Sequence, residues 1–250
     1  MTRSRIARLF CLVVLVIVAA TACGRGTPAT EKPKAPPIDL SPPPKPTVLI
    51  LGDSVTAGWG LISSQAYPAL LQNKLVADGF DVEVENAGVS GDTTAGGLRR
   101  MDWVLRANVR VLMVALGAND ALRGLTVAET HKNLAGIIEA AQARNISVML
   151  IGMEAPPNLG QDYQTAFHGM YAQLASDYRG VAYVPFLLDG VAGHPELNQA
   201  DGVHPNEKGS QVIADALYPK LHQIMDAVFT NGGGLIDGDS RIDGGSRIDR

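Results

Sequence analysis

The fold of this chain is decided by the stretch Thr47-Val48-Leu49-Ile50-Leu51-Gly52-Asp53-Ser54, in which a short apolar run ends in a small polar motif. The run from Thr47 to Leu51 is continuous rather than alternating. Such a run is typical of a strand that is covered on both faces, as in a parallel sheet. Gly52 permits a sharp exit, so Ser54 is expected just beyond the strand, where the chain turns into a short helix.

Four further apolar runs predict strands, and helical patterns fill the gaps between them. The strand candidates are residues 82–84, 109–115, 147–151 and 181–184. The helix candidates are residues 66–77, 126–144 (opened by a capping box), 163–178 and a last helix after Pro205-Asn206. Strands that alternate with helices predict an α/β fold, a doubly wound three-layer sandwich with a roughly five-stranded parallel sheet. Ligands of such folds bind beyond the carboxyl ends of the strands.

Two of these helices carry apolar residues at helical spacing, which predicts their buried faces. In the helix from residue 126 they are Val127, Leu134, Ile137, Ile138 and Ala141. In the last helix they are Val212, Ile213, Ala216 and Leu217.

The two ends of the chain differ in composition from the part between them. Residues 1–22 combine three arginines with a short apolar run, which is typical of an export signal peptide. Residues 23–46 are rich in proline and predict an extended linker. Residues 230–250 form a low-complexity tail of glycine, aspartate and arginine, to which we assign no function. The catalytic domain is therefore expected at residues 47–229, a single domain of ordinary size.

Cys23 follows the expected signal peptide, and two ways of processing are open there. Ala20-Thr21-Ala22 fits ordinary secretory cleavage. Small residues before a cysteine also resemble a bacterial lipobox, although Ala20 stands where leucine is usual. Cys11 lies inside the signal, so the exported chain keeps one cysteine without a disulfide partner, and lipidation would explain it. We therefore favour a lipoprotein anchored to the membrane of a bacterial cell envelope over a free secreted form.

The charge of the chain argues against nucleic acid as a partner. The formal net charge is −4, and loss of residues 1–22 leaves 18 Lys and Arg against 25 Asp and Glu, a charge of −7. Phosphate binding needs a basic footprint, which this balance does not supply. Membrane association is expected from the lipid anchor rather than from attraction to anionic lipid. We expect a monomer.

Ser54 has two interpretations on its own motif. Serine and aspartate are favoured helix N-caps, but a serine at a strand exit is also a nucleophile when a neighbouring base takes its proton. His204 is the candidate base, because Asp201 lies three residues earlier in a glycine-containing turn and can hold the proton on one ring nitrogen. The other nitrogen is then free to face Ser54. We interpret the other four histidines as structural or solvated.

Attack on an ester or thioester places negative charge on the carbonyl oxygen, and hydrogen-bond donors must stabilise it. Gly91 can present its backbone N–H without a side chain in the way. Asn119 can present a side-chain amide just after the predicted strand 109–115. The N–H of Ser54 is the third candidate donor. Taken alone, Gly91-Asp92 and Asn119-Asp120 are equally consistent with ordinary turns.

Four motifs occur in a fixed order: Gly52-Asp53-Ser54, Ser90-Gly91-Asp92, Gly117-Ala118-Asn119-Asp120 and Asp201-Gly202-Val203-His204-Pro205. Their order and content resemble the SGNH (GDSL) hydrolase family. The resemblance is greatest to the branch of bacterial thioesterase I, lysophospholipase L1 and arylesterase. It implies a flavodoxin-like fold and catalytic roles for Ser54, Gly91, Asn119 and His204, with Asp201 completing the triad. Val55 and Ala118 depart from the common family residues.

The motifs and the resemblance together predict an exported serine esterase that acts on carboxylic esters, thioesters or lysophospholipids through an acyl-enzyme. One alternative is an O-acetyl esterase acting on cell-envelope polysaccharide, and a second is a surface lipoprotein that only binds. Leu122, Leu125 and Pro156 are candidates for an acyl groove. No cluster of histidine, cysteine and acidic residues has metal-ligand spacing, so we expect neither metal nor cofactor. The chain also lacks a Gly-x-Ser-x-Gly elbow, which disfavours the α/β-hydrolase fold.

Overall fold

The carboxyl ends of five parallel strands form the edge of the sheet on which the polar motifs lie. The computed structural model describes residues 44–231, without the side chains of residues 230 and 231. The expected signal peptide, Cys23, most of the linker and most of the tail lie outside these residues. The described residues all belong to one unit. None of their helices is long and apolar enough to cross a bilayer.

The sheet has the strand order β2-β1-β3-β4-β5, and all of its pairings are parallel. The strands are β1 (Thr47–Gly52), β2 (Glu83–Gly88), β3 (Val109–Ala115), β4 (Ser147–Ile151) and β5 (Ala182–Val184). The chain moves from β1 to β2 on one side and returns to β3 on the other. The crevice between the carboxyl ends of β1 and β3 is therefore the switch point at which doubly wound sheets bind ligands.

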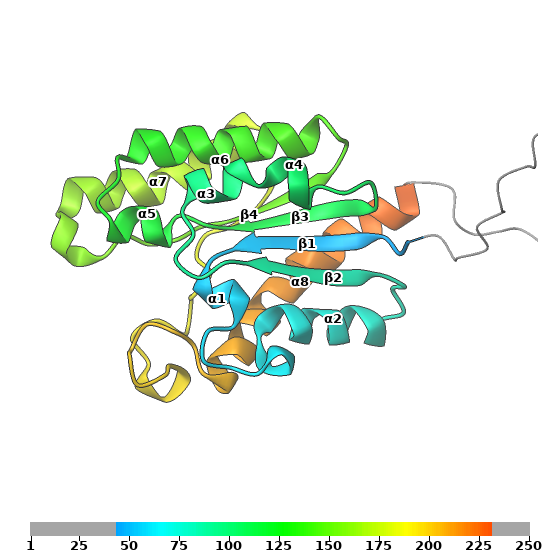
Figure 1. Cartoon of the computed structure of the whole chain (residues 1–250), viewed down its shortest axis with the longest axis horizontal. Helices are drawn as coiled ribbons and strands as arrows, with labels where there is room; N and C mark the ends of the chain where they lie inside the picture. The colour runs from blue at the N-terminus through cyan, green and yellow to red at the C-terminus, as the bar shows by residue number, and fades with distance from the viewer. Residues whose placement is uncertain (1–43, 232–250) are drawn as a thin grey trace, which may run out of the picture. The chain divides into compact units, whose positions relative to one another are not determined.

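Helices cover both faces of the sheet, which confirms the predicted three-layer sandwich (Figure 1). Helices α2 and α8 pack together on one face, and α3, α6 and α7 lie on the other. The α-helices are α1 (Ser54–Ala57), α2 (Tyr67–Ala77), α3 (Thr94–Arg99), α4 (Met101–Val104), α5 (Ala118–Leu122), α6 (Val127–Gln142), α7 (Gln161–Asp177) and α8 (Glu207–Asn231). Short 3₁₀ turns are η1 (Ser63–Gln65), η2 (Pro157–Leu159) and η3 (Pro195–Leu197).

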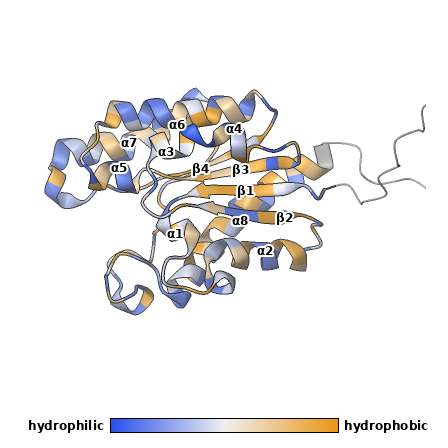
Figure 2. Ribbon diagram, viewed as in Figure 1, coloured by the Kyte–Doolittle hydropathy of each residue, from blue (hydrophilic) through white to orange (hydrophobic). Residues whose placement is uncertain are grey.

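The central strands and the inner helix faces form the core. All six residues of β1 are buried, and β3 is buried except for Arg110. Figure 2 shows the central strands in hydrophobic colours, whereas the outer helices carry both kinds of residue. The predicted capping box opens α6, where the N–H of Glu129 donates to Thr126 Oγ1 at 3.2 Å. Four of the five apolar positions predicted on α6 are buried, and Val127 is half-buried.

Helices α3, α4 and α5 were not among the expected helices, and the ends of α6 and α7 differ from the expected ones by one or two residues. Two further differences concern β2 and α8. β2 begins at Glu83 rather than residue 82 and runs on to Gly88, and none of its residues is fully buried. It is an edge strand, so its alternation of polar residues hides it from a search for apolar runs. On α8, Ala216 is exposed and Ala214 is buried instead. Ala214 shares a face with Leu217 and Leu221, at spacings of three and seven residues.

Candidate active site

Ser54 is the first residue of α1, directly beyond the carboxyl end of β1. The N-cap of this helix is Asp53, whose Oδ1 accepts from the N–H of Val55 at 3.1 Å. The interpretation of Ser54 itself as the cap is therefore wrong. Position 52 favours glycine, because a Cβ there would overlap the side chain of Thr56. The hydroxyl of Ser54 is thus left free of capping and faces the loop that carries His204.

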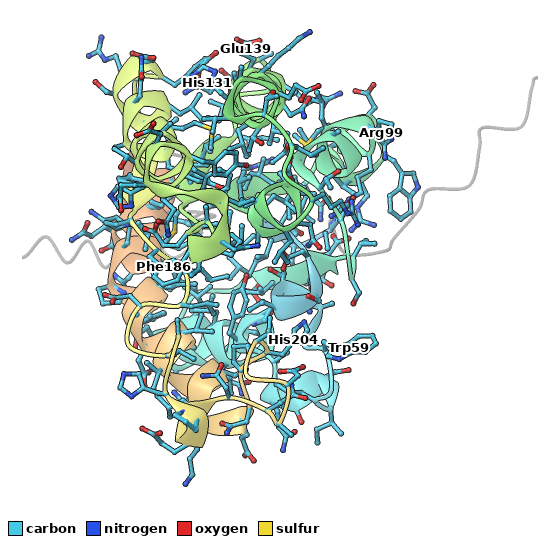
Figure 3. All side chains as sticks on the ribbon, turned by 90° about the vertical axis from the view of Figure 1, so that its left-hand side faces the viewer. Trp59, Arg99, His131, Glu139, Phe186 and His204 are labelled. Atoms are coloured by element: carbon cyan, nitrogen blue, oxygen red, sulfur yellow. The ribbon has the colours of Figure 1, made fainter. Side chains whose placement is uncertain are left out.

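Ser54, His204 and Asp201 form a chain of hydrogen bonds. Ser54 Oγ lies 2.9 Å from His204 Nε2, and His204 Nδ1 lies 2.7 Å from Asp201 Oδ2. A proton on Nδ1 is donated to the carboxylate, which leaves the Nε2 lone pair directed at the serine hydroxyl. Figure 3 shows His204 near the surface of the molecule, next to Trp59. The arrangement has the geometry that a serine nucleophile and its general base require.

The loop around Asp201 keeps the carboxylate ionised and aimed at the imidazole. The backbone N–H groups of His204 and Val203 donate to Asp201 Oδ1 at 3.0 and 2.9 Å. These two bonds, followed by the bond to the His204 side chain, lower the pKa of Asp201 to about 2. Gly202 takes a left-handed conformation with φ of +69° that bends the loop around the carboxylate. Asp201 is therefore ionised throughout the neutral pH range.

Gly91 lies in the turn that follows β2, with a φ of +78° that few other residues adopt. Its carbonyl accepts from Arg123 Nη2 at 2.8 Å. Asp92 forms an ion pair with Arg100 at 2.9 Å, and both side chains are largely buried. These bonds hold the turn in place. Within it the N–H of Asp92 donates to the carbonyl of Val89 at 3.0 Å, whereas the N–H of Gly91 has no acceptor among the described residues.

Arg100 is a positioning residue that sequence reasoning missed. Besides Asp92, its guanidinium donates to the carbonyl of Ala87 at 2.6 Å and to that of Gly52 at 3.1 Å. One side chain thus joins the carboxyl ends of β1 and β2 to the turn of Gly91. An arginine in a helical pattern gives no such signal, since its partners come from distant parts of the chain.

Asn119 lies in α5, after β3, and its side chain is oriented by a buried carboxylate. Asn119 Nδ2 donates to Asp53 Oδ2 at 3.2 Å. This bond uses one amide hydrogen and leaves the second for another acceptor. Asp120, next in the chain, accepts from the N–H of Thr94 at 2.8 Å and so ties α5 to α3. The pair is therefore more than an ordinary turn.

Asp53 is the second residue whose part in the site was missed. The residue is only 1% exposed. Burial raises its pKa to about 6, and the N–H of Val55, the nearby His204 and the Asn119 amide counteract that rise. The signal was present in the Gly-Asp-Ser motif, but only the fold reveals that the aspartate faces inward to Asn119.

The three acyl-groove candidates occupy separate parts of this region. Leu122 is 64% exposed on α5, one turn after Asn119, while Leu125 and Pro156 are half-buried. The carbonyl of Leu125 accepts from the Tyr163 hydroxyl at 2.7 Å. A cavity of about 320 Å³ lies against the loop that carries Asp201, and none of the three lines it. Their contact with an acyl chain stays a prediction.

The part of the chain that the structure describes contains no set of side chains suited to bind a metal ion. Within residues 44–231, no group of three or more histidine, cysteine and acidic side chains is arranged to hold an ion. The polar groups at the sheet edge instead form the hydrogen-bonded sets around Ser54 and Asn119 described above.

The sequence and the fold of this chain are similar to those of several known proteins. A model described as the GDSL-like lipase/acylhydrolase family matches residues 50–212, a span that includes all four motifs. The esterase TesA of Pseudomonas aeruginosa is 41% identical over 180 residues, covering 72% of this chain and 89% of TesA. The Escherichia coli thioesterase 1/protease 1/lysophospholipase L1 is 36% identical over 181 residues, which are 72% of this chain and 85% of the Escherichia coli protein. The structure of AlinE4, an SGNH-hydrolase family esterase, matches with a TM-score of 0.61 and 44% sequence identity, and the match covers 73% of this chain and 98% of AlinE4.

Proposed function

Because this chain belongs to the GDSL-like lipase/acylhydrolase family and is an ester-bond hydrolase, we propose that it is an exported serine esterase acting through Ser54, His204 and Asp201. The family and branch predicted from the motifs are confirmed by these relatives. The observation that carries the mechanism is the chain of bonds from Ser54 Oγ to His204 Nε2 and from His204 Nδ1 to Asp201.

In the acylation step, His204 Nε2 takes the proton of the Ser54 hydroxyl as Oγ attacks the carbonyl carbon of the substrate. The imidazolium that forms is stabilised by the ionised Asp201. Collapse of the tetrahedral intermediate breaks the bond to the leaving oxygen or sulfur. His204 gives its proton to that atom, so the alcohol or thiol departs neutral and an acyl-Ser54 ester remains.

The oxyanion of the intermediate is stabilised by the backbone N–H groups of Ser54 and Gly91 and by the side-chain amide of Asn119. Asp53 supports this role, because its bond to Asn119 Nδ2 holds the amide in one orientation. Arg100 supports the Gly91 turn through its ion pair with Asp92. Preorganised donors of this kind stabilise the transition state without reorganising during the reaction.

Deacylation repeats the same chemistry with water as the nucleophile. His204 removes a proton from water, the hydroxide attacks the acyl carbon, and the Ser54 oxygen leaves and takes the proton back. The products are a carboxylic acid and the restored serine. No cofactor enters any of these steps.

Substrate class and location are further parts of the proposal. The names of the two curated relatives support acyl esters, acyl thioesters and lysophospholipids as substrates. The expected signal peptide and Cys23 support export and lipid anchoring at a bacterial cell envelope. Both residues 1–22 and Cys23 lie outside the described part of the chain, so this part rests on sequence.

The experiment pairs covalent labelling with turnover in the wild type and Ser54→Ala. We expect an alkyl fluorophosphonate to label the wild type alone, and p-nitrophenyl esters of two to sixteen acyl carbons to be hydrolysed by it alone. Turnover near the wild-type rate in Ser54→Ala contradicts the proposed nucleophile. A preference for six carbons or more supports lipid or thioester substrates, whereas a maximum at acetate with a steep decline supports polysaccharide deacetylation instead. Absence of labelling and turnover in the folded wild type favours a binding protein.

A further inference from the structure

Trp59 is a large apolar side chain that the fold keeps in solvent beside the proposed base. It is 56% exposed. Its ring centroid lies 6.1 Å from that of His204, with the two planes inclined by 37°. Figure 3 shows the indole at the surface next to His204. An exposed aromatic ring forgoes the stabilisation that burial would give, so one held beside a reactive group is a candidate ligand contact.

The backbone around Trp59 is held at both ends. Its N–H donates to the carbonyl of Ser54 at 3.0 Å, and its carbonyl accepts from Gln199 Nε2 at 2.6 Å. Gly58 and Gly60, on either side, both have left-handed backbone conformations. A Cβ on Gly60 would overlap the side chain of Gln199. The position of Trp59 relative to Ser54 is therefore set by the fold rather than by free motion of a loop.

His204 identifies the part of the substrate that Trp59 would meet. In the proposed reaction, Nε2 donates a proton to the leaving atom, which must come within hydrogen-bond reach of it. The carbonyl oxygen faces the oxyanion donors instead. The group bonded to the leaving atom therefore lies beside the His204 ring. Trp59, whose ring lies beside that of His204, presents apolar surface there.

We propose that Trp59 is a specificity-determining residue for the leaving group, and that it favours esters whose alcohol part is flat and apolar, with aryl alcohols as the chemical class. This inference rests on the proposed function of Ser54 and His204. An aryl ring can stack on the indole face or meet it edge-on, which are the arrangements aromatic pairs prefer. A small alkyl alcohol gains only a fraction of that contact.

The test compares phenyl butyrate with ethyl butyrate in the wild type, Trp59→Ala, Trp59→Phe and Trp103→Ala. Both esters form the same butyryl-enzyme, so their deacylation is identical and kcat/KM reports binding and acylation. Comparing each ester across variants cancels its intrinsic reactivity. Trp103 is the other tryptophan of the chain. It lies on α4 and is 81% exposed, so Trp103→Ala is the matched control.

We expect Trp59→Ala to lower kcat/KM for phenyl butyrate about 5-fold relative to ethyl butyrate, the size of one aromatic contact. Trp59→Phe should keep most of the preference, and Trp103→Ala should leave the ratio at the wild-type value. An unchanged ratio in Trp59→Ala, or an equal fall for both esters, overturns the inference. A similar fall of the phenyl-to-ethyl ratio in Trp103→Ala also overturns the inference.

Failure of the inference differs measurably from failure of the proposed function. If only the inference fails, Ser54→Ala is inactive toward both esters while the phenyl-to-ethyl ratio of Trp59→Ala matches the wild type. If the proposed function fails, Ser54→Ala hydrolyses both esters. Should Trp59→Ala fold poorly, Trp59→Leu replaces it, because leucine fills the position without an aromatic ring; the phenyl-to-ethyl ratio should then fall below that of Trp59→Phe, and equal ratios in these two variants overturn the inference.

Discussion

Replacement of Asp53 by asparagine is expected to lower activity and, as the pH rises, to increase stability relative to the wild type. Asp53 is buried, and burial is the largest contribution to the rise of its pKa from 3.8 to about 6. Asparagine retains an oxygen that can accept from the N–H of Val55. It cannot ionise, however, and its amide hydrogens face those of Asn119. The substitution therefore removes a buried charge and disturbs the orientation of a proposed oxyanion donor.

The magnitude follows from linkage between protonation and folding. The unfolded chain loses the Asp53 proton above its ordinary pKa, whereas the folded chain holds that proton until about pH 6, so ionisation destabilises the wild type. The destabilisation is absent well below the ordinary pKa, reaches about 1 kcal/mol at about pH 4.5, and levels off at about 3 kcal/mol by about pH 8. Asp53→Asn lacks this destabilisation. Its free energy of unfolding relative to the wild type should therefore rise by about 2 kcal/mol between about pH 4.5 and about pH 8.

The assay is urea unfolding of both proteins across this pH range, with Asp189→Asn, an exposed carboxylate, as the control. Lost hydrogen bonds shift the Asp53→Asn curve by a constant, so the pH-dependent part isolates the charge. We also expect kcat to fall about 100-fold, as for loss of one oxyanion donor. A stability difference that does not change between about pH 4.5 and 8 refutes the assignment of Asp53 as a carboxylate whose pKa burial raises.

Three further outcomes are expected. Asn119→Ala should lower kcat about 100- to 1000-fold with little change in KM, because the donor acts on the transition state; a change confined to KM in steady-state kinetics would contradict it. Arg100→Met should lower the free energy of unfolding by about 3 kcal/mol or more, since Asp92 would stay buried without its partner. Exposed Arg99→Met should stay within about 0.5 kcal/mol. Cys23→Ser should abolish labelling by a radioactive fatty acid in the bacterial host, and equal labelling of both proteins would sink the lipoprotein proposal.

The strands that could be predicted accurately are those buried on both faces. The predicted bounds 109–115 and 147–151 agree with β3 and β4, because a short, continuous apolar run rich in branched residues is typical of a strand covered on both faces. β2 was predicted too short, since an edge strand with polar residues at Glu85 and Asn86 lacks that signal. Helix ends carrying a local cap were also predictable, as at Thr126, because the signal lies within four residues.

The motifs identified the residues at the sheet edge, but not the side chains that orient them. Ser54, Gly91, Asn119 and His204 each stand in a short motif beside a strand end or turn, so their proximity followed from a parallel sheet. The bond between Asp53 and Asn119 joins residues 66 positions apart. The indole of Trp59 reaches His204 from a loop far away in the chain. No local pattern reports such contacts.

The amino-acid sequence by itself determined the alternation of strands and helices, the family of this chain and the residue types available at the carboxyl edge of the sheet. Those properties depend on local periodicity and on motifs of three to five residues. The tertiary structure alone decided that Asp53 caps α1 and faces Asn119, that Arg100 joins two strand ends to the Gly91 turn, and that Trp59 stands beside His204. Each of these depends on strand order and on which groups are buried together, and therefore on packing between segments that are distant in the chain.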